Sequence, residues 1–95
     1  MKTILTIALL LSGTAFAENV SFSKDIKPIF AKICTVCHNG SNPLPLVTLY
    51  PIAFRLRSTI KTRVSDNKGM PAYGVYISES DRALVKQWVL DGGKQ

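Results

Sequence analysis

Residues that carry most protein chemistry are scarce in this chain. Its 95 residues include one histidine, two cysteines and two methionines, of which Met1 is the initiator. A structural zinc site takes four ligands, usually as two pairs, and no second cysteine or histidine pair exists here. Both cysteines and the histidine lie within five positions, Cys34-Thr35-Val36-Cys37-His38, so this segment is the first candidate for a functional site.

The chain also lacks an apolar run long enough to span a bilayer. Its N-terminal run has roughly 14 residues, whereas a spanning helix needs about 20. Met1-Lys2, the apolar residues 4–11 and the small-x-small sequence Ala15-Phe16-Ala17 have the order of a secretory signal peptide. We therefore expect cleavage after residue 17, a mature domain of residues 18–95 in the periplasm, and no stable membrane insertion after cleavage.

Acidic residues are few. Six of them stand against twelve basic residues, which gives a net charge of +6. The basic residues are spread along the chain and do not gather with aromatics, so no nucleic-acid partner is predicted. On an exported protein such a surface favours an acidic partner or an anionic surface, although an ordinary solvated face would have the same composition.

No run alternates apolar and polar residues as a half-buried strand would, so the fold class predicted is all-α. The first helix is expected to have Asp25 as its N-cap, Pro28 in its first turn and an end near Cys34. Its apolar positions have helical spacing: Ile26, Ile29, Phe30 and Ile33.

Two further helices are predicted. The middle one begins at Pro51 and ends near Thr59 or Ile60, between loops at residues 38–47 and 65–71 that are rich in turn-forming residues. The last one has Ser78 as its N-cap and ends at Gly92-Gly93. The chain is thus about three helices joined by two long loops.

The cysteine segment can serve three chemistries. Thiol–disulfide exchange of the thioredoxin type uses a βαβ unit, for which this chain has no pattern, and zinc lacks a second ligand pair. The third is covalent haem, whose attachment signature is C-x-x-C-H. Cys34 and Cys37 are one helical turn apart and can each reach a vinyl group, while His38 projects toward the iron.

Met70 is the candidate for the second axial ligand. It is the methionine that remains after cleavage at residue 17, and it lies in a polar loop between Gly69 and Pro71. A core methionine is expected on an apolar stripe, whereas a thioether is a common partner of histidine in electron-carrying haem. The position of Met70 favours the ligand interpretation.

With these motifs, the sequence resembles the small class I cytochromes c over essentially the whole mature chain. The similarity rests on FSKDIKPIFAKICTVCH, on Gly69-Met70-Pro71 and on the last helix with Trp88. It implies a cytochrome c fold wrapped around one covalently attached haem c, with the N- and C-terminal helices crossing beside it. It also implies that Cys34 and Cys37 attach the haem, that His38 is the proximal ligand and that Met70 is the distal one.

The resemblance implies a one-electron carrier, not an enzyme, that shuttles between Fe(III) and Fe(II). Redox proteins with an acidic docking surface are the expected partners, and the protein works as a monomer or as a subunit of a redox complex. The alternative is a haem-based gas sensor, or the haem subunit of a larger periplasmic oxidoreductase, with a labile Met70.

Finer expectations concern the surroundings of the haem. The carbonyl of Pro43 or Pro45 is expected to orient the His38 ring. The candidates for pairing with the propionates are Arg55, Arg57, Lys61 and Arg63. The candidates for packing on the macrocycle are Ile29, Phe30, Leu44, Leu46, Leu56, Ile60 and Trp88.

Overall fold

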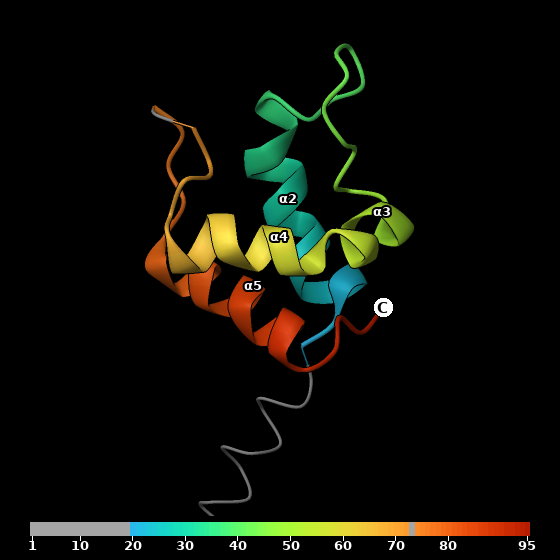
Figure 1. Cartoon of the computed structure of the whole chain (residues 1–95), viewed down its shortest axis with the longest axis vertical. Coiled ribbons are helices and arrows are strands. Elements are labelled where there is room, and N and C mark those ends of the chain that lie inside the picture. Colours follow the sequence, from blue (N-terminus) through green and yellow to red (C-terminus); the bar gives the residue numbers. More distant parts are fainter. Residues whose placement is uncertain (1–19, 73) are drawn as a thin grey trace, which may run out of the picture.

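The computed structural model describes residues 20–72 and 74–95, and all regular structure in these ranges is helical (Figure 1). The predicted signal peptide, residues 1–17, lies outside the described residues. The helical segments are η1 Phe22–Ile26, α2 Lys27–Ile33, η2 Cys34–Val36, α3 Tyr50–Arg55, α4 Arg57–Lys61, η3 Thr62–Asp66 and α5 Glu79–Leu90. They form three runs, which confirms the predicted all-α class.

The first run begins earlier than predicted, because Ser21 and not Asp25 is its N-cap. Ser21 is extended, and its Oγ accepts the N–H of Lys24 at 3.3 Å. Asp25 supports this cap from inside the helix, where its Oδ2 accepts the N–H of Ser21 at 2.9 Å. The earlier start brings Phe22 into the helix, and Phe22 is almost fully buried.

Pro28 therefore lies one turn further into the helix than predicted. Its ring would crowd the carbonyl four residues before it, and it has no N–H to donate. The preceding turn is a wide π turn, in which the N–H of Lys27 donates to the oxygen of Phe22. This turn lets the helix continue through Pro28 to Ile33 and into the 3-10 turn of Cys34–Val36, close to the predicted end.

The middle run is longer than predicted. It begins at Tyr50 with Pro51 in its first turn, as expected, but Leu56 leaves the α region at φ −97° and ψ 11° and separates α3 from α4. The run then continues through η3 to Asp66, so the predicted end near Thr59 or Ile60 is wrong. The extra turn exists because Val64 is buried where η3 packs on α5.

The last run matches its prediction. Ser78 Oγ accepts the N–H of Asp81 at 3.0 Å, and the helix ends in a Schellman motif. In that motif Gly92 N–H donates to Val89 at 3.0 Å and Gly93 N–H donates to Trp88 at 2.8 Å. Both glycines have positive φ, +103° and +71°, which explains why glycine occupies the two positions.

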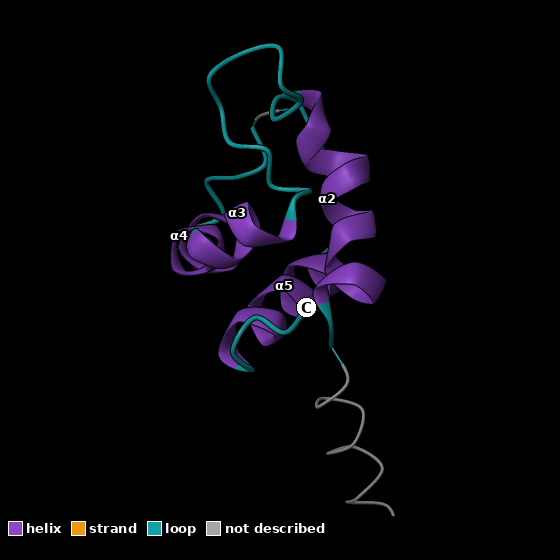
Figure 2. Ribbon diagram, turned by 90° about the vertical axis from the view of Figure 1, so that its right-hand side faces the viewer, coloured by secondary structure: helices purple, strands orange, loops and turns teal. Residues whose placement is uncertain are grey.

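The start of the first run packs against α5, and the C-terminal tail crosses beside them (Figure 2). The Phe22 ring lies 5.6 Å from Trp88 and 5.4 Å from Tyr50, measured between ring centroids. The tail carbonyl of Lys94 accepts both the Phe22 N–H and the Trp88 Nε1–H at 2.8 Å. We call this region, made of η1, α5 and residues 93–95, the packed end.

The two long loops, residues 38–49 and the described residues 67–72 and 74–77, both extend away from the packed end, one on each side of α2 (Figure 1). We call these loops, together with α2 and the part of the middle run from Leu56 to Asp66, the cavity side. Within the described residues, none of the helices has the length and apolarity that crossing a bilayer requires.

Candidate haem site

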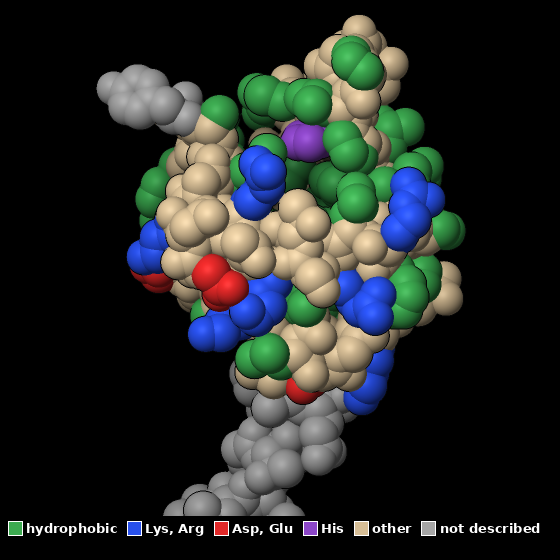
Figure 3. Space-filling view, in the orientation of Figure 1, with side chains coloured by type: hydrophobic (Ala, Val, Ile, Leu, Met, Phe, Trp, Pro, Cys, Tyr) green, Lys and Arg blue, Asp and Glu red, His purple; other side chains and the backbone are tan. Residues whose placement is uncertain are grey.

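A cavity of about 410 Å³ opens between α2, the middle run and the two loops. All four predicted site residues, Cys34, Cys37, His38 and Met70, contribute to its wall. In the space-filling view the histidine lies in a hollow among hydrophobic side chains (Figure 3). The fold thus brings together two motifs that the sequence separates by more than thirty positions.

The cysteine motif is shaped by the tight turn that ends the first run. The N–H groups of Cys37 and His38 both donate to the carbonyl of Cys34, at 3.1 Å and 2.7 Å. Both cysteines are free thiols and half-buried. The turn fixes the three side chains at the same end of the helix, next to the cavity.

The Cys34 thiol is unsuited to redox exchange. Burial, together with the nearby Cys37, raises the pKa of Cys34 to about 11. A thiol with such a pKa is protonated at neutral pH, whereas catalytic dithiols have a lowered pKa that exposes the thiolate. This argues against the thioredoxin-type interpretation. Among the described residues, no group of three or more Cys, His, Asp and Glu side chains is placed to hold a metal ion.

The His38 ring is oriented by the loop that follows it. Its Nδ1 lies 2.8 Å from the carbonyl oxygen of Pro45, and a carbonyl can only accept, so Nδ1 carries the hydrogen. The lone pair available to a metal is then on Nε2. Asn42 orders the loop by donating to the carbonyl of Cys37 at 2.9 Å and accepting from Leu44 N–H at 3.0 Å. Of the two expected prolines, Pro45 is confirmed.

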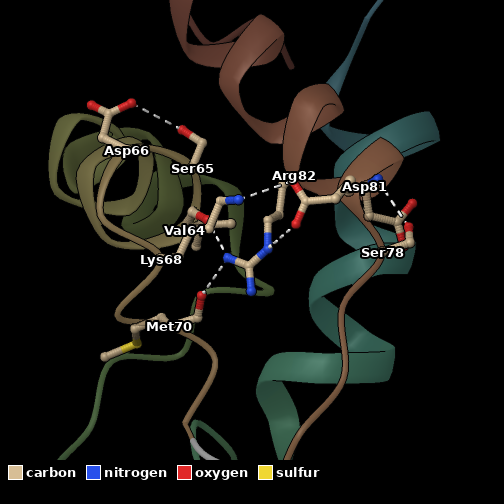
Figure 4. A network of polar contacts seen from close by, with 9 residues as sticks. Val64, Ser65, Asp66, Lys68, Met70, Ser78, Asp81 and Arg82 are labelled. Carbon is tan, nitrogen blue, oxygen red and sulfur yellow. Dashed lines mark hydrogen bonds and ion pairs between the residues drawn. The ribbon is translucent and has the colours of Figure 1, made fainter.

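Met70 is held by its backbone. Its N–H donates to the carbonyl of Arg63 at 2.8 Å, and its carbonyl accepts from Arg82 Nη1 at 3.0 Å. Its side chain extends away from Arg82 and forms part of the cavity wall (Figure 4). The thioether therefore faces the same cavity as the histidine.

The four basic residues expected to pair with the propionates differ in whether they reach the cavity. Arg63 contributes to the cavity wall, and the other three do not. Arg57 donates to the carbonyl of Phe54 at 2.8 Å and lies 3.9 Å above the Phe54 ring, while Lys61 pairs with Asp66 at 2.7 Å. Arg55 is exposed. Arg63 is the one of the four that is placed to face a group in the cavity.

The expected packing residues differ in whether they reach the cavity. Phe30, Leu44, Leu56 and Ile60 line the cavity. Ile29, Leu46 and Trp88 do not, and Trp88 is instead completely buried in the packed end. The sequence pattern shows that these residues are apolar but does not show which of them face the cavity.

Sequence reasoning missed Arg82. It donates from Nη1 to the carbonyls of Val64 and Met70 and pairs through Nε with Glu79 at 3.4 Å. A signal was present, because a cation in the first turn of a helix opposes the helix dipole. A residue in such an unfavourable position calls for a specific partner.

Comparison with known proteins agrees with this geometry. The chain is 31% identical to a cytochrome c6 from Picosynechococcus sp. over 110 aligned positions, which cover 96% of this chain and 94% of that protein. The chain belongs to the small class I cytochromes c. It is a small haem electron carrier with one covalently bound haem c. No family model and no solved structure matches the chain.

The residues present fit this group. The cavity is within the usual size range of ligand pockets, roughly 300–1,000 Å³, and its wall is mostly apolar. Two thiols lie at one edge for thioether bonds, and the Nε2 of His38 and the thioether sulfur of Met70 are available to the iron. These two are the ligand types that cytochromes c use.

Proposed function

We propose that this protein is an exported one-electron carrier in which Cys34 and Cys37 hold the haem while His38 and Met70 are its axial ligands. The observation that carries the proposal is the convergence of these four side chains, from two distant segments, on one apolar cavity. Export with cleavage after residue 17, into the periplasm, is part of the proposal and rests on the order of the N-terminal residues.

When bound, the haem supplies the Fe(III)/Fe(II) couple. The chain's residues prepare the site for it: Pro45 fixes the tautomer and the plane of the His38 imidazole. Met70 fills the distal position, which keeps substrates off the iron and raises the reduction potential relative to a second histidine. The apolar wall excludes water, so little solvent has to reorganise when the charge changes.

Basic residues are proposed to guide docking to an acidic redox partner. Lys and Arg side chains lie around the face that contains the hollow, with few acidic ones among them (Figure 3). Charge complementarity mainly raises the association rate, and salt weakens it. We expect the second-order rate constant with the physiological partner to fall as ionic strength rises. A rate independent of salt would contradict the docking proposal.

The test of the ligand assignment compares the purified wild-type protein with Met70→Ala. The wild type is expected to be low-spin in both oxidation states and to bind no carbon monoxide when reduced. Met70→Ala should bind carbon monoxide readily, since one axial position is open. Leu49→Ala is the matched control, because Leu49 is 49% exposed and outside the cavity wall.

The same experiment separates the carrier from the gas sensor. Ready carbon monoxide binding by the reduced wild type would favour a sensor with a labile Met70. Exclusion of carbon monoxide in Met70→Ala would overturn the assignment of Met70 as the distal ligand.

A further inference from the structure

The segment that carries Met70 has few anchors of its own. Residues 67–72 contain no regular structure, and Lys68 has a positive φ of +57°. Gly69 N–H donates to the side chain of Asn67 at 2.9 Å, and Met70 N–H reaches back to Arg63. Two side-chain contacts tie this segment to α5: Lys68 pairs with the exposed Glu79 at 3.3 Å, and Arg82 donates to the carbonyl of Met70.

Arg82 connects the end of the middle run to the segment that carries Met70. One nitrogen, Nη1, donates to the carbonyl of Val64, in the last turn of η3, and to the carbonyl of Met70 (Figure 4). The first turn of α5 thereby fixes the distance between the end of the middle run and the methionine. The side chain is 15% exposed, so water competes weakly for these bonds.

The position of Arg82 is unfavourable without these partners. It lies in the first turn of α5, where the helix dipole repels a cation, and removing a charge from water is costly unless it is paired. Glu79 supplies part of the pairing at 3.4 Å, and Lys68 joins the same carboxylate at 3.3 Å. Glu79 is 73% exposed, so its ion pairs contribute little, and the two carbonyls remain the main partners.

We propose that Arg82 is a positioning residue that keeps the Met70 thioether at the cavity and thereby sets how seldom the distal ligand leaves the iron. The inference rests on the proposed ligation by Met70. Hydrogen bonds from a charged donor are the stronger kind, so their loss shifts the equilibrium toward the open segment.

The test measures imidazole binding to the oxidised haem protein, because imidazole competes with Met70 for one axial position. Its apparent affinity scales with the fraction of molecules in which that position is open. We expect Arg82→Gln to bind imidazole about ten- to a hundred-fold more tightly than wild type, which corresponds to the net loss of roughly one charge-assisted bond, since water can donate to the carbonyls that are freed. Arg82→Lys, which keeps the charge but not the planar fork, is expected to lie between the two.

Two control variants distinguish the loss of a positive charge on α5 from the loss of the hydrogen bonds that Arg82 donates. Lys86→Gln removes one positive charge from an exposed site one turn further along α5, and it should leave the imidazole affinity unchanged within about twofold. Glu79→Gln keeps both carbonyl bonds of Arg82 and should shift the affinity far less than Arg82→Gln. Equal affinities in Arg82→Gln and wild type would overturn the proposal, as would an equal shift in Lys86→Gln.

A second readout does not depend on the haem ligand. Hydrogen exchange at the Met70 amide, measured by mass spectrometry of the peptide covering residues 67–76, should quicken in Arg82→Gln and stay unchanged in Lys86→Gln. If Arg82→Gln does not fold, Arg82→Lys carries both measurements. Lower thermal stability with unchanged exchange and imidazole affinity would make Arg82 a structural residue only and overturn the proposal.

Imidazole affinity and hydrogen exchange together also distinguish a failure of the Met70 assignment from a failure of the Arg82 proposal. One possible result is that the wild type shows no methionine ligation while hydrogen exchange at Met70 is faster in Arg82→Gln. This result would contradict the assignment of Met70 as the distal ligand. Arg82 would then still hold the segment in place, but its proposed role in ligation would be overturned. Methionine ligation in wild type with no change in either readout contradicts Arg82 alone.

Discussion

The packed end and the cavity side differ in what covers their apolar side chains. In the packed end, Trp88 and Phe22 are buried by other side chains, and the C-terminal tail satisfies polar groups of both helices. On the cavity side, five buried core residues form part of a cavity wall: Phe30, Ile33, Val47, Val64 and Ile77. The chain fills the first region by itself, whereas the second surrounds a cavity that the haem would fill.

This difference explains how so short a chain can hold one fold. A domain of this size has a small side-chain core and often relies on a cofactor for stability. Here the wall residues that the chain leaves partly exposed, among them Leu44, Leu56 and Ile60, would gain burial against the haem, at roughly 1.5–3 kcal/mol for each large side chain that becomes fully buried.

Loss of haem attachment is expected to have the largest effect. Replacing both cysteines, Cys34→Ala with Cys37→Ala, should yield a chain without covalent haem that has lost most of its helical circular dichroism and its cooperative thermal transition. Thr35→Ala, between the two cysteines and outside the cavity wall, is the control that should retain both. A haem-free chain with a cooperative, native-like fold would show that the cavity side closes by itself.

Trp88→Ala tests the other region. Removal of a large, fully buried aromatic side chain is expected to lower the free energy of unfolding by about 3–5 kcal/mol. The absorption spectrum of the folded fraction should stay that of the wild type, because Trp88 does not line the cavity. A changed haem spectrum in the folded protein would mean that the two regions are not separate.

The two glycines of the tail give a matched pair of smaller effects. Ala in place of Gly92 adds only the strain of a positive φ, which we expect to lower stability by about 1 kcal/mol. At Gly93 the added Cβ would also lie 2.9 Å from Arg57 Cδ and 3.1 Å from Phe54 Cδ1. The free energy of unfolding in denaturant should therefore be lower for Gly93→Ala than for Gly92→Ala. The reverse order would contradict close packing of the tail on α3 and α4.

The smallest effect concerns Asp66, at the border of the cavity side. The hydrogen bond from Lys61 lowers the pKa of Asp66 below its ordinary 3.8, so the folded state favours the ionised form. This contribution is present at neutral pH and is lost as pH falls below about 4, through the folded pKa. The difference in free energy of unfolding between wild type and Asp66→Asn, measured by urea titration, should shrink as the pH falls. A difference that grows would contradict a lowered pKa of Asp66.

Prediction from the sequence succeeded for most local signals, although the Ser21 cap, which is also local, was missed. The Ser78 cap, the Gly92-Gly93 end and the C-x-x-C-H turn each depend on contacts within six residues, and the structure has them as expected. The end of the middle run was missed because it depends on Val64 packing against a helix that begins fifteen positions later. Arg82 was missed for the same reason, since its partners lie 12 and 18 positions away.

The central claim, that His38 and Met70 ligate one haem iron in this cavity, is tested most directly by X-ray absorption at the iron edge of the oxidised protein. We predict nitrogen neighbours from the porphyrin and His38 together with one sulfur neighbour. The sulfur should disappear in Met70→Ala and persist in Leu49→Ala. A wild-type iron without a sulfur neighbour, or a sulfur that persists in Met70→Ala, would contradict the account.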